Sequence, residues 1–179
     1  MIIAVDIDNV LNNLTEKVLE LYNADSGDCI TLPDITCYSI ESFIKPDYVS
    51  HIGDYFSCAA VLAKPQPGAV EYIQKLRDDG HDIYFVTSTT YGVMPAKIDW
   101  MQKHFGLIST RRIVRLHDKF LFKCDIMIDD YLSNLTGSGY QKIVLDYPWN
   151  RIDSELDKML GINRAQNWDE IYRFIKEGT

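Results

Sequence analysis

The sequence predicts an α/β protein built on a doubly wound parallel sheet. Short apolar, β-branched runs alternate along the chain with segments whose apolar residues recur at helical spacing. Acid pairs directly follow two of the runs, Asp6 with Asp8 and Asp129 with Asp130. Open parallel sheets bind ligands at the carboxyl ends of their strands. We therefore expect both acid pairs at one edge of a single sheet.

The first expected strand, at residues 2–5, is apolar enough to be buried on both faces. If the extended backbone continues past it, alternation places the Asp6 and Asp8 side chains on the same side. Two like charges that close repel each other, and a bound divalent cation removes the repulsion. Such pairs also occur at solvated turns, so this pair alone leaves both interpretations open.

The segment after the first strand has a different character. Helical spacing predicts a helix from about residue 14 to 23, and Asn13 with Glu16 resembles a capping box. Residues 24–66 lack a clean repeat, and we expect short helices there instead of strands. Their aromatic residues favour a small core of their own, although one or two could also stack on a ligand: Tyr38, Phe43, Tyr48, Tyr55 and Phe56.

A regular alternation begins after the Pro and Gly cluster at residues 64–68, which indicates a boundary. Helical periodicity and β-branched runs then follow each other to the end of the chain. The elements expected are a helix from 69 to Gly80, a strand at 82–87, a helix through Ile98 and Phe105, strands at 112–116, 125–129 and 142–146, and helices at 152–160 and 168–175.

Composition narrows the function classes. The chain has 179 residues and a net charge of −8, which argues against a broad nucleic-acid-binding surface. No apolar stretch approaches the length of a membrane span, and the N-terminal apolar run is too short for a signal peptide. The four cysteines are scattered, as is typical of a reduced, cytoplasmic protein.

Other polar residues stand at the ends of the remaining strands. Thr87 and Ser88 follow the second strand, and Lys119 follows the third. Hydroxyl groups and lysine bind phosphate oxygens, and clustered carboxylates bind Mg²⁺. This combination is typical of phosphoryl transfer, where positioning and charge neutralisation supply most of the catalysis. Lys123 is the nearby alternative to Lys119, and the spacing favours Lys119.

In this order the motifs resemble those of the haloacid dehalogenase-like (HAD) phosphatases. The matching residues are Asp6-Ile7-Asp8-Asn9-Val10-Leu11, Thr87-Ser88, Lys119 and Asp129-Asp130. Within that superfamily the chain is most similar to the 5'(3')-deoxyribonucleotidases of the cytosolic type C 5'-nucleotidase family. That narrower likeness rests on Pro67-Gly68-Ala69-Val70 and on Asp118-Lys119 before the run 125–130.

The resemblance implies a role for each residue. Asp6 is the expected nucleophile, which forms an aspartyl-phosphate, and Asp8 is the expected acid and base. Mg²⁺ is expected on Asp6, the backbone carbonyl of Asp8 and Asp130, with Asp129 orienting these ligands. Thr87, Ser88 and Lys119 are the expected phosphate ligands.

The resemblance also implies a domain organisation and a substrate. Residues 14–65 are expected to form a helical cap inserted after the first strand, over a core domain at 1–13 and 66–179. The expected substrate is a small phosphate monoester, a nucleoside 5'-monophosphate and preferably a deoxyribonucleotide. No oligomeric state is predicted.

Two departures from the family pattern stand out. Asn9 occupies the position of the usual glycine, and asparagine tolerates the backbone angles of such a turn. Tyr131-Leu132 stand where the deoxyribonucleotidases often have an arginine and a proline, which affects the substrate assignment.

Three other functions are considered. A signalling receiver domain also uses acids, a hydroxyl and a lysine, but the second acid pair and the long insertion argue against it. A non-catalytic phosphate-binding protein would not need every acid of the motif. A HAD phosphatase of another small phosphate ester differs only in its cap.

Overall fold

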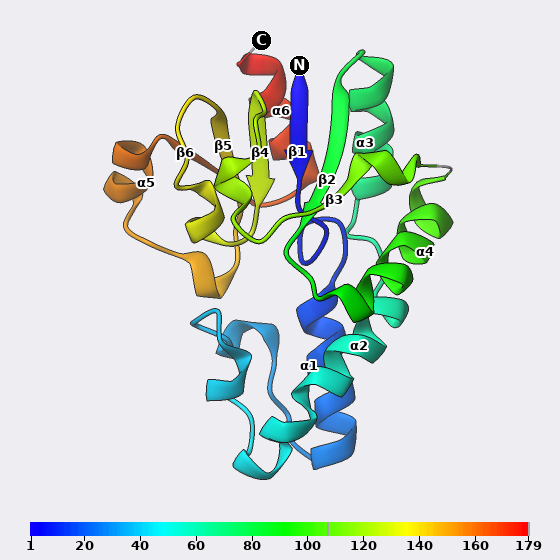
Figure 1. Ribbon diagram of the computed structural model, residues 1–179. Helices are drawn as coiled ribbons and strands as arrows, with labels where there is room; N and C mark the ends of the chain where they lie inside the picture. The colour runs from blue at the N-terminus through cyan, green and yellow to red at the C-terminus, as the bar shows by residue number, and fades with distance from the viewer. Residues whose placement is uncertain (107, 179) are drawn as a thin grey trace.

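The computed structural model describes residues 1–106 and 108–178, and in them a single six-stranded sheet forms the centre of the molecule (Figure 1). Every strand pairs in parallel, in the order β3-β2-β1-β4-β5-β6. The prediction of an α/β protein with a parallel, doubly wound sheet is confirmed. The strands are β1 (Ile2–Val5), β2 (Asp82–Thr87), β3 (Ile113–Arg115), β4 (Ile126–Asp129), β5 (Gln141–Leu145) and β6 (Ile162–Ala165).

Helices cover one face of this sheet. The apolar stripes of α3 (Ala69–Asp78), α4 (Met94–Phe105) and α6 (Trp168–Glu177) pack on the strands in the main core cluster. A second, smaller cluster lies on the other face, under residues of short 3₁₀ turns and loops, and α5 (Ser154–Leu160) lies beside β6. The central strands are apolar on both faces because both faces are covered.

The order of the strands decides where the acids meet. From β1 the chain adds β2 and β3 on one side of the sheet, and it then crosses back to add β4, β5 and β6 on the other side. Strands β1 and β4 are therefore neighbours, although 120 residues of sequence separate Asp6 from the start of β4 at Ile126. Val5 is in register with Ile128, and the amide of Asp6 donates to the Ile128 carbonyl at 2.9 Å. The carboxyl ends of β1 and β4 therefore lie side by side, at the position where such sheets bind ligands.

Residues 14–65, which we call the cap segment, lie beyond this edge of the sheet (Figure 1). They form α1 (Leu14–Ser26), α2 (Ile52–Leu62) and three 3₁₀ turns, η1 (Leu32–Asp34), η2 (Ile40–Ser42) and η3 (Pro46–His51). Three of the expected aromatic residues pack against a small apolar cluster within the segment, namely Phe43, Tyr55 and Phe56. The two ends of the segment are held together by Asn13, whose amide donates to the Lys64 carbonyl at 3.0 Å. The division into two domains stays a prediction.

Strand β6 was not predicted from the sequence. It is an edge strand that pairs only with β5, and half of its residues, Asn163 and Arg164, are polar and partly exposed. A strand at the edge of a sheet has a neighbouring strand on one side only and is partly exposed to solvent. It therefore does not need the continuous apolar run that marks a central strand.

The expected capping box of Asn13 with Glu16 is wrong. Asn13 Nδ2 donates to Glu16 Oε2 at 3.0 Å, which joins two side chains and caps no backbone amide. The first amides of α1 are instead bound by side chains of the preceding loop, Leu14 by Asn12 Oδ1 at 3.1 Å and Thr15 by Asn9 Oδ1 at 2.9 Å. The helix also continues three residues beyond the predicted end.

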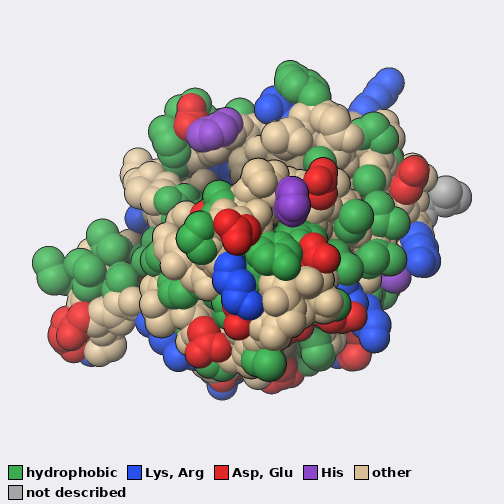
Figure 2. Space-filling model, turned by 90° about the horizontal axis from the view of Figure 1, so that it is seen from below, with side chains coloured by type: hydrophobic (Ala, Val, Ile, Leu, Met, Phe, Trp, Pro, Cys, Tyr) green, Lys and Arg blue, Asp and Glu red, His purple; other side chains and the backbone are tan. Residues whose placement is uncertain are grey.

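Figure 2 shows the surface on the side of the cap segment, where lysine and arginine side chains are dispersed among acidic and apolar ones. This arrangement does not resemble the contiguous basic surface of a nucleic-acid-binding protein. Within residues 1–106 and 108–178, no helix combines the length and the apolar character needed to cross a bilayer.

Arg164 should stabilise the β6 side of the sheet. Its guanidinium reaches Asp157 Oδ2 at 2.7 Å and Asp146 Oδ1 at 2.9 Å, and both carboxylates are nearly buried. Arg164→Ala removes the cation that pairs with Asp157 and leaves Asp146 with Arg151 alone, and we expect a loss of roughly 3 kcal/mol in the free energy of unfolding, measured by urea denaturation. The control is Arg151→Ala, because the Arg151 side chain is exposed, Asp146 keeps Arg164 in that variant, and the loss should be less than about 1 kcal/mol. Equal losses in the two variants would contradict this account.

Candidate active site

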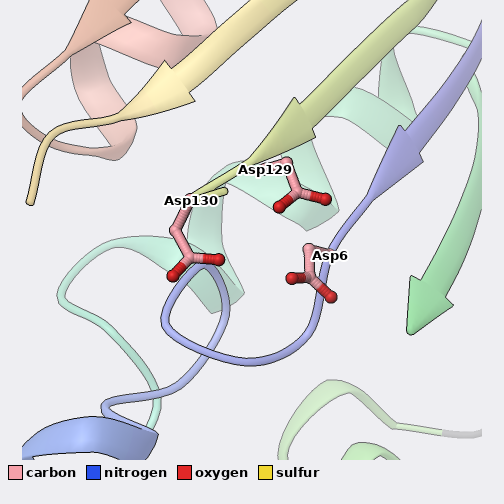
Figure 3. A group of neighbouring side chains, drawn as sticks. All are labelled: Asp6, Asp129 and Asp130. Atoms are coloured by element: carbon pink, nitrogen blue, oxygen red, sulfur yellow. The ribbon is translucent and has the colours of Figure 1, made fainter. Parts of the chain in front are cut away.

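Three carboxylates form the centre of the site. Oxygen atoms of Asp6, Asp129 and Asp130 lie within 4.8 Å of one another, and all three residues are buried. Asp6 follows β1, while Asp129 ends β4 and Asp130 follows it, so the three side chains point toward one another from neighbouring strand ends (Figure 3). The predicted convergence of both acid pairs is thus realised for three of the four acids.

Lys119 supplies positive charge to this cluster. Its buried ammonium lies 2.7 Å from Asp6 Oδ1 and 2.9 Å from Asp129 Oδ2. Burial alone would lower the pKa of Lys119, but the two carboxylates raise it above its usual range, so the side chain stays charged. Lys123, the alternative at the sequence level, is exposed.

One lysine does not neutralise three acids. Burial raises the pKa of Asp6 from 3.8 to about 7, with repulsion from Asp129 and Asp8 adding to the effect and Lys119 opposing it. Burial, then Asp129 and Asp6, also raise the pKa of Asp130 well above its usual value. Both shifts have one physical cause, an excess of negative charge in a place that water does not reach.

Asp8 occupies a different environment from Asp6. The backbone leaves the extended conformation after Val5 and turns at Asp8. The expectation that strand alternation places the Asp6 and Asp8 side chains on the same side is therefore wrong. The Asp8 carboxylate, about a quarter exposed, forms an ion pair with the ammonium of Lys97 and lies outside the three-carboxylate group. Any part of Asp8 in metal binding is therefore left to its backbone carbonyl.

Lys97 is a site residue that the sequence did not indicate. It lies on α4, its side chain is 3% exposed, and its ammonium also donates to Thr87 Oγ1 at 3.2 Å. Nothing in the helix marks this lysine apart from its place among the apolar residues Met94, Ile98 and Met101. A lysine buried on the apolar face of a helix needs an acidic partner, and that was the available signal.

The two predicted hydroxyl residues differ in position. Thr87 ends β2 and is buried, with its hydroxyl directed to Lys97. Ser88 is exposed. The structure therefore brings Thr87, Asp8 and Lys97 together, with Ser88 next to them along the chain.

Asn9 fits the turn that a glycine usually forms. Its φ is +59°, which is the left-handed region that asparagine tolerates better than most residues. Its side chain links three parts of the site, because Nδ2 donates to Asp130 Oδ2 at 3.1 Å while Oδ1 accepts from the start of α1. A glycine would leave both bonds unmade.

Asp129 and Asp130 have unequal surroundings. Asp129 accepts from Lys119, from the Tyr131 amide at 2.9 Å and from Asn134 Nδ2 at 3.0 and 3.1 Å, and both of its oxygens are engaged. The Asp130 side chain accepts from Asn9 and Trp149, both at Oδ2. Because hydrogen bonds engage both of its oxygens, Asp129 is suited to orient neighbouring groups. Asp130 accepts these hydrogen bonds at Oδ2 and is better placed to bind a cation through Oδ1.

A slot lies between Asp8 and the cap segment. It has a volume of about 140 Å³ and is lined from both sides by Asp8, Asn9, Leu14, Thr15, Ile35, Tyr38, Ile40, Phe56 and Trp149. Tyr38, half exposed, stacks on Tyr131 with ring centroids 3.8 Å apart, so a cap residue lies on the residue after the second acid pair. A separate cavity of about 250 Å³ near Gln66 and Trp168 is lined by none of Asp6, Asp8, Asp129 and Asp130.

Comparison with known proteins agrees with this geometry. The family described as 5' nucleotidase, deoxy (Pyrimidine), cytosolic type C matches residues 1–178. The chain belongs to this family. It is therefore a phosphoric monoester hydrolase of the 5'-nucleotidase type, and the resemblance indicated by the motifs is confirmed.

Two relatives span nearly the whole chain. A 5'(3')-deoxyribonucleotidase of Clostridium acetobutylicum is 30% identical over 176 residues, which cover 94% of this chain and 91% of that protein. A 5'(3')-deoxyribonucleotidase of Bacillus subtilis is 29% identical over 177 residues, 96% of each chain. The family likeness thus includes the cap segment as well as the sheet.

Solved structures support the fold. A haloacid dehalogenase-like protein from Agrobacterium tumefaciens superposes with a TM-score of 0.69 at 10% identity, over 98% of this chain and 97% of that one. A HAD family hydrolase from Deinococcus radiodurans, solved with bound phosphate and sodium, gives a TM-score of 0.59 at 15% identity over 98% and 94%. The 5'-nucleotidase therefore has the HAD fold.

The excess charge at Asp6 should make the stability of the metal-free enzyme depend on pH. The pKa of Asp6 is about 7 when folded and 3.8 when unfolded, so the folded state binds more protons between these values. The contribution of Asp6 to stability is then fully present below pH 4 and is lost as the pH rises to about 7, by an amount on the order of a few kcal/mol. Asp6→Asn cannot ionise and should lose much of this slope.

The measurement is chemical denaturation of both proteins in chelator from pH 4 to 8. Added Mg²⁺ should restore stability at pH 8 more in the parent than in Asp6→Asn, because a cation offsets the extra charge. Parallel stability curves for the two proteins would contradict the assignment of the slope to Asp6.

Proposed function

We propose that the protein is a Mg²⁺-dependent phosphatase that hydrolyses nucleoside 5'-monophosphates, preferably deoxyribonucleotides, through an aspartyl-phosphate on Asp6. The observation that carries the proposal is the position of Asp6, which lies among two further buried carboxylates and Lys119, two residues from Asp8, which lines a slot beneath the cap segment. Such a site supplies a nucleophile, positive charge and a place for a small ester.

The first half-reaction transfers the phosphoryl group to the protein. A carboxylate oxygen of Asp6 attacks phosphorus, the bond from phosphorus to the ester oxygen breaks, and Asp8 gives its proton to the departing oxygen. In the second half-reaction Asp8 takes a proton from water, the water oxygen attacks phosphorus, and the bond to Asp6 breaks. Asp8 lines the slot, where a leaving group would stand, and the Lys119 ammonium 2.7 Å from Asp6 Oδ1 favours the ionised carboxylate that a nucleophile requires.

Four side chains would bind the phosphate oxygens. Lys119 lies beside the nucleophile, Thr87 ends the neighbouring strand β2, and Ser88 follows Thr87. Lys97 contacts both Asp8 and Thr87, so its ammonium can bind an oxygen of a phosphate placed between them. Two lysines from different elements would then offset the charge of a dianionic group.

Asp6, Asp130 and the backbone carbonyl of Asp8 would hold Mg²⁺, with Asp129 orienting them. The donor set fits this ion, because hard oxygen ligands from clustered carboxylates are what Mg²⁺ prefers. When bound, Mg²⁺ supplies charge that balances the carboxylates and the phosphate. Asp129 is already engaged by Lys119 and Asn134, which supports the orienting role.

The cap segment would select the substrate. Tyr38, Phe56 and Trp149 line the slot, and one of these rings can stack on a base. The acidic chain offers little to balance the extra charge of a triphosphate.

The free thiols of all four cysteines support a cytoplasmic location.

A second candidate is a HAD phosphatase of a smaller ester. The slot of about 140 Å³ is below the volume of about 300 Å³ at which ligand pockets usually begin. A nucleotide therefore requires the slot, which Tyr38 lines, to widen, whereas a smaller ester does not.

Asp6→Asn should lower turnover by several orders of magnitude, because an amide oxygen does not form the acyl phosphate. Asp8→Asn should slow both half-reactions by roughly 10²–10⁴-fold, the usual contribution of general acid–base catalysis. Rapid-quench measurement of phosphoryl transfer and phosphate release separates the two effects, with circular dichroism as the check on folding. Unchanged rates in either variant would remove that residue from its role.

The substrate assignment is tested by kcat/KM for dUMP, dTMP, UMP, AMP, ATP, glycerol phosphate and a phosphopeptide. We expect the deoxyribonucleotides to be preferred. Tyr38→Ala should lower kcat/KM for them by about tenfold, the value of one base stack, and leave glycerol phosphate unaffected. Preference for glycerol phosphate over every nucleotide would support the second candidate, and preference for ATP or the phosphopeptide would contradict both.

A further inference from the structure

Trp149 lies outside every motif that the sequence indicated, in the 3₁₀ turn η8 (Pro148–Asn150) after β5. Its indole Nε1 donates to Asp130 Oδ2 at 3.2 Å. The same ring lines the slot opposite residues of the cap segment, and it packs against apolar residues of both the main core and the cap cluster. One side chain thus contacts Asp130 and the cap cluster and lines the slot.

The indole is held firmly on the core side. Its ring stacks on Tyr147, with centroids 4.3 Å apart and planes 6° from parallel. The Tyr147 hydroxyl donates to the Asn9 carbonyl at 2.7 Å. Asn150, the next residue, donates from Nδ2 to the carbonyls of Asp130 and Leu145, both at 2.8 Å. The direction of the Trp149 N–H is therefore set before any ligand binds.

The indole also meets the cap segment. The turn η1 contacts η8, and Leu32 and Trp149 pack against the same core cluster. On its slot side the indole faces the same cavity as Tyr38 and Phe56. A change in how the cap segment lies on the core would therefore change the surroundings of Trp149.

We propose that Trp149 is a positioning residue that couples the Asp130 carboxylate to the cap segment, an inference that rests on the proposed function. Its N–H restricts rotation of the carboxylate, so that Asp130 is already oriented when the cation binds. Its ring forms the core-side wall of the slot and the surface on which the cap segment rests. The N–H thus acts on metal binding, and the ring acts on substrate binding.

Two substitutions separate these effects. Trp149→Phe removes the N–H and keeps an aromatic ring, whereas Trp149→Ala removes both. Mg²⁺ binding to the metal-free protein is measured by isothermal titration calorimetry, without substrate. We expect both variants to bind Mg²⁺ about tenfold more weakly, as is usual when a group that orients a ligand is lost. We expect KM for the preferred nucleotide to rise strongly in Trp149→Ala only, with the phenyl ring restoring it.

Two further variants serve as the positive and negative controls for the loss of Mg²⁺ binding. Asp130→Ala removes the proposed ligand itself and should abolish Mg²⁺ binding in the same titration. Trp100→Phe removes another buried indole hydrogen bond, from Nε1 to the Ala63 carbonyl at 2.7 Å, away from the acids. It should bind Mg²⁺ as the parent does. Circular dichroism and thermal unfolding of each variant confirm that the protein tested is folded.

The outcomes are distinct. If the parent protein binds no Mg²⁺, the proposed function is overturned and this inference falls with it. If the parent binds Mg²⁺ and Trp149→Phe binds it equally well, the role of the N–H is overturned while the proposed function stands. If KM in Trp149→Ala equals that in Trp149→Phe, the role of the ring as the slot wall is overturned.

Discussion

The electrostatic repulsion among Asp6, Asp129 and Asp130 is the constraint on which the rest of the site depends. Their oxygens lie within 4.8 Å of one another in a buried position, and within the described part of the chain Lys119 is the single ammonium paired with them. Parallel pairing of β1 with β4 forces the convergence, because the acids stand at the ends of these strands. The groups around the cluster, Lys119, Asn9, Asn134 and Trp149, are all donors directed at carboxylate oxygens. The remaining negative charge is what a cation and a phosphoryl group with its lysines would balance.

The turn at Asn9 explains how two acids one residue apart acquire different surroundings. Asp6 remains beside the sheet, with Lys119, whereas Asp8 is carried away from it to Lys97 on α4. The positive φ of Asn9 allows the chain to reverse there, and its side chain ties the turn to Asp130 and to α1. Separate environments for neighbouring carboxyl groups are how one site obtains a nucleophile and an acid. The same turn starts α1, so the geometry of the acids and the entry to the cap segment are set together.

The central strands were predictable because burial on both faces requires continuous apolar runs, as in Ile2–Val5 and Ile126–Asp129. The acids and Lys119 were predictable because they follow predicted strands, and the carboxyl ends of parallel strands lie at the same edge of a sheet. Strand β6 was missed since an edge strand tolerates Asn163 and Arg164. Lys97 and Trp149 were missed for a different reason. Their functional contacts span 89 residues for Lys97 with Asp8 and 19 for Trp149 with Asp130. The place of Lys97 on the apolar face of α4 was a local signal, but it does not identify the distant partner.

The central claim is that Asp6 carries the phosphoryl group during turnover, and trapping the acyl phosphate tests it most directly. The enzyme is mixed with a preferred nucleotide, quenched within milliseconds and reduced with borohydride, which converts an aspartyl-phosphate to homoserine. Trypsin then releases the peptide of residues 1–17, which contains both Asp6 and Asp8, and fragmentation in the mass spectrometer locates the reduced residue. We expect homoserine at position 6 only, and none in enzyme incubated without substrate. Homoserine at position 8, or a peptide left unreduced during steady turnover, would contradict the account.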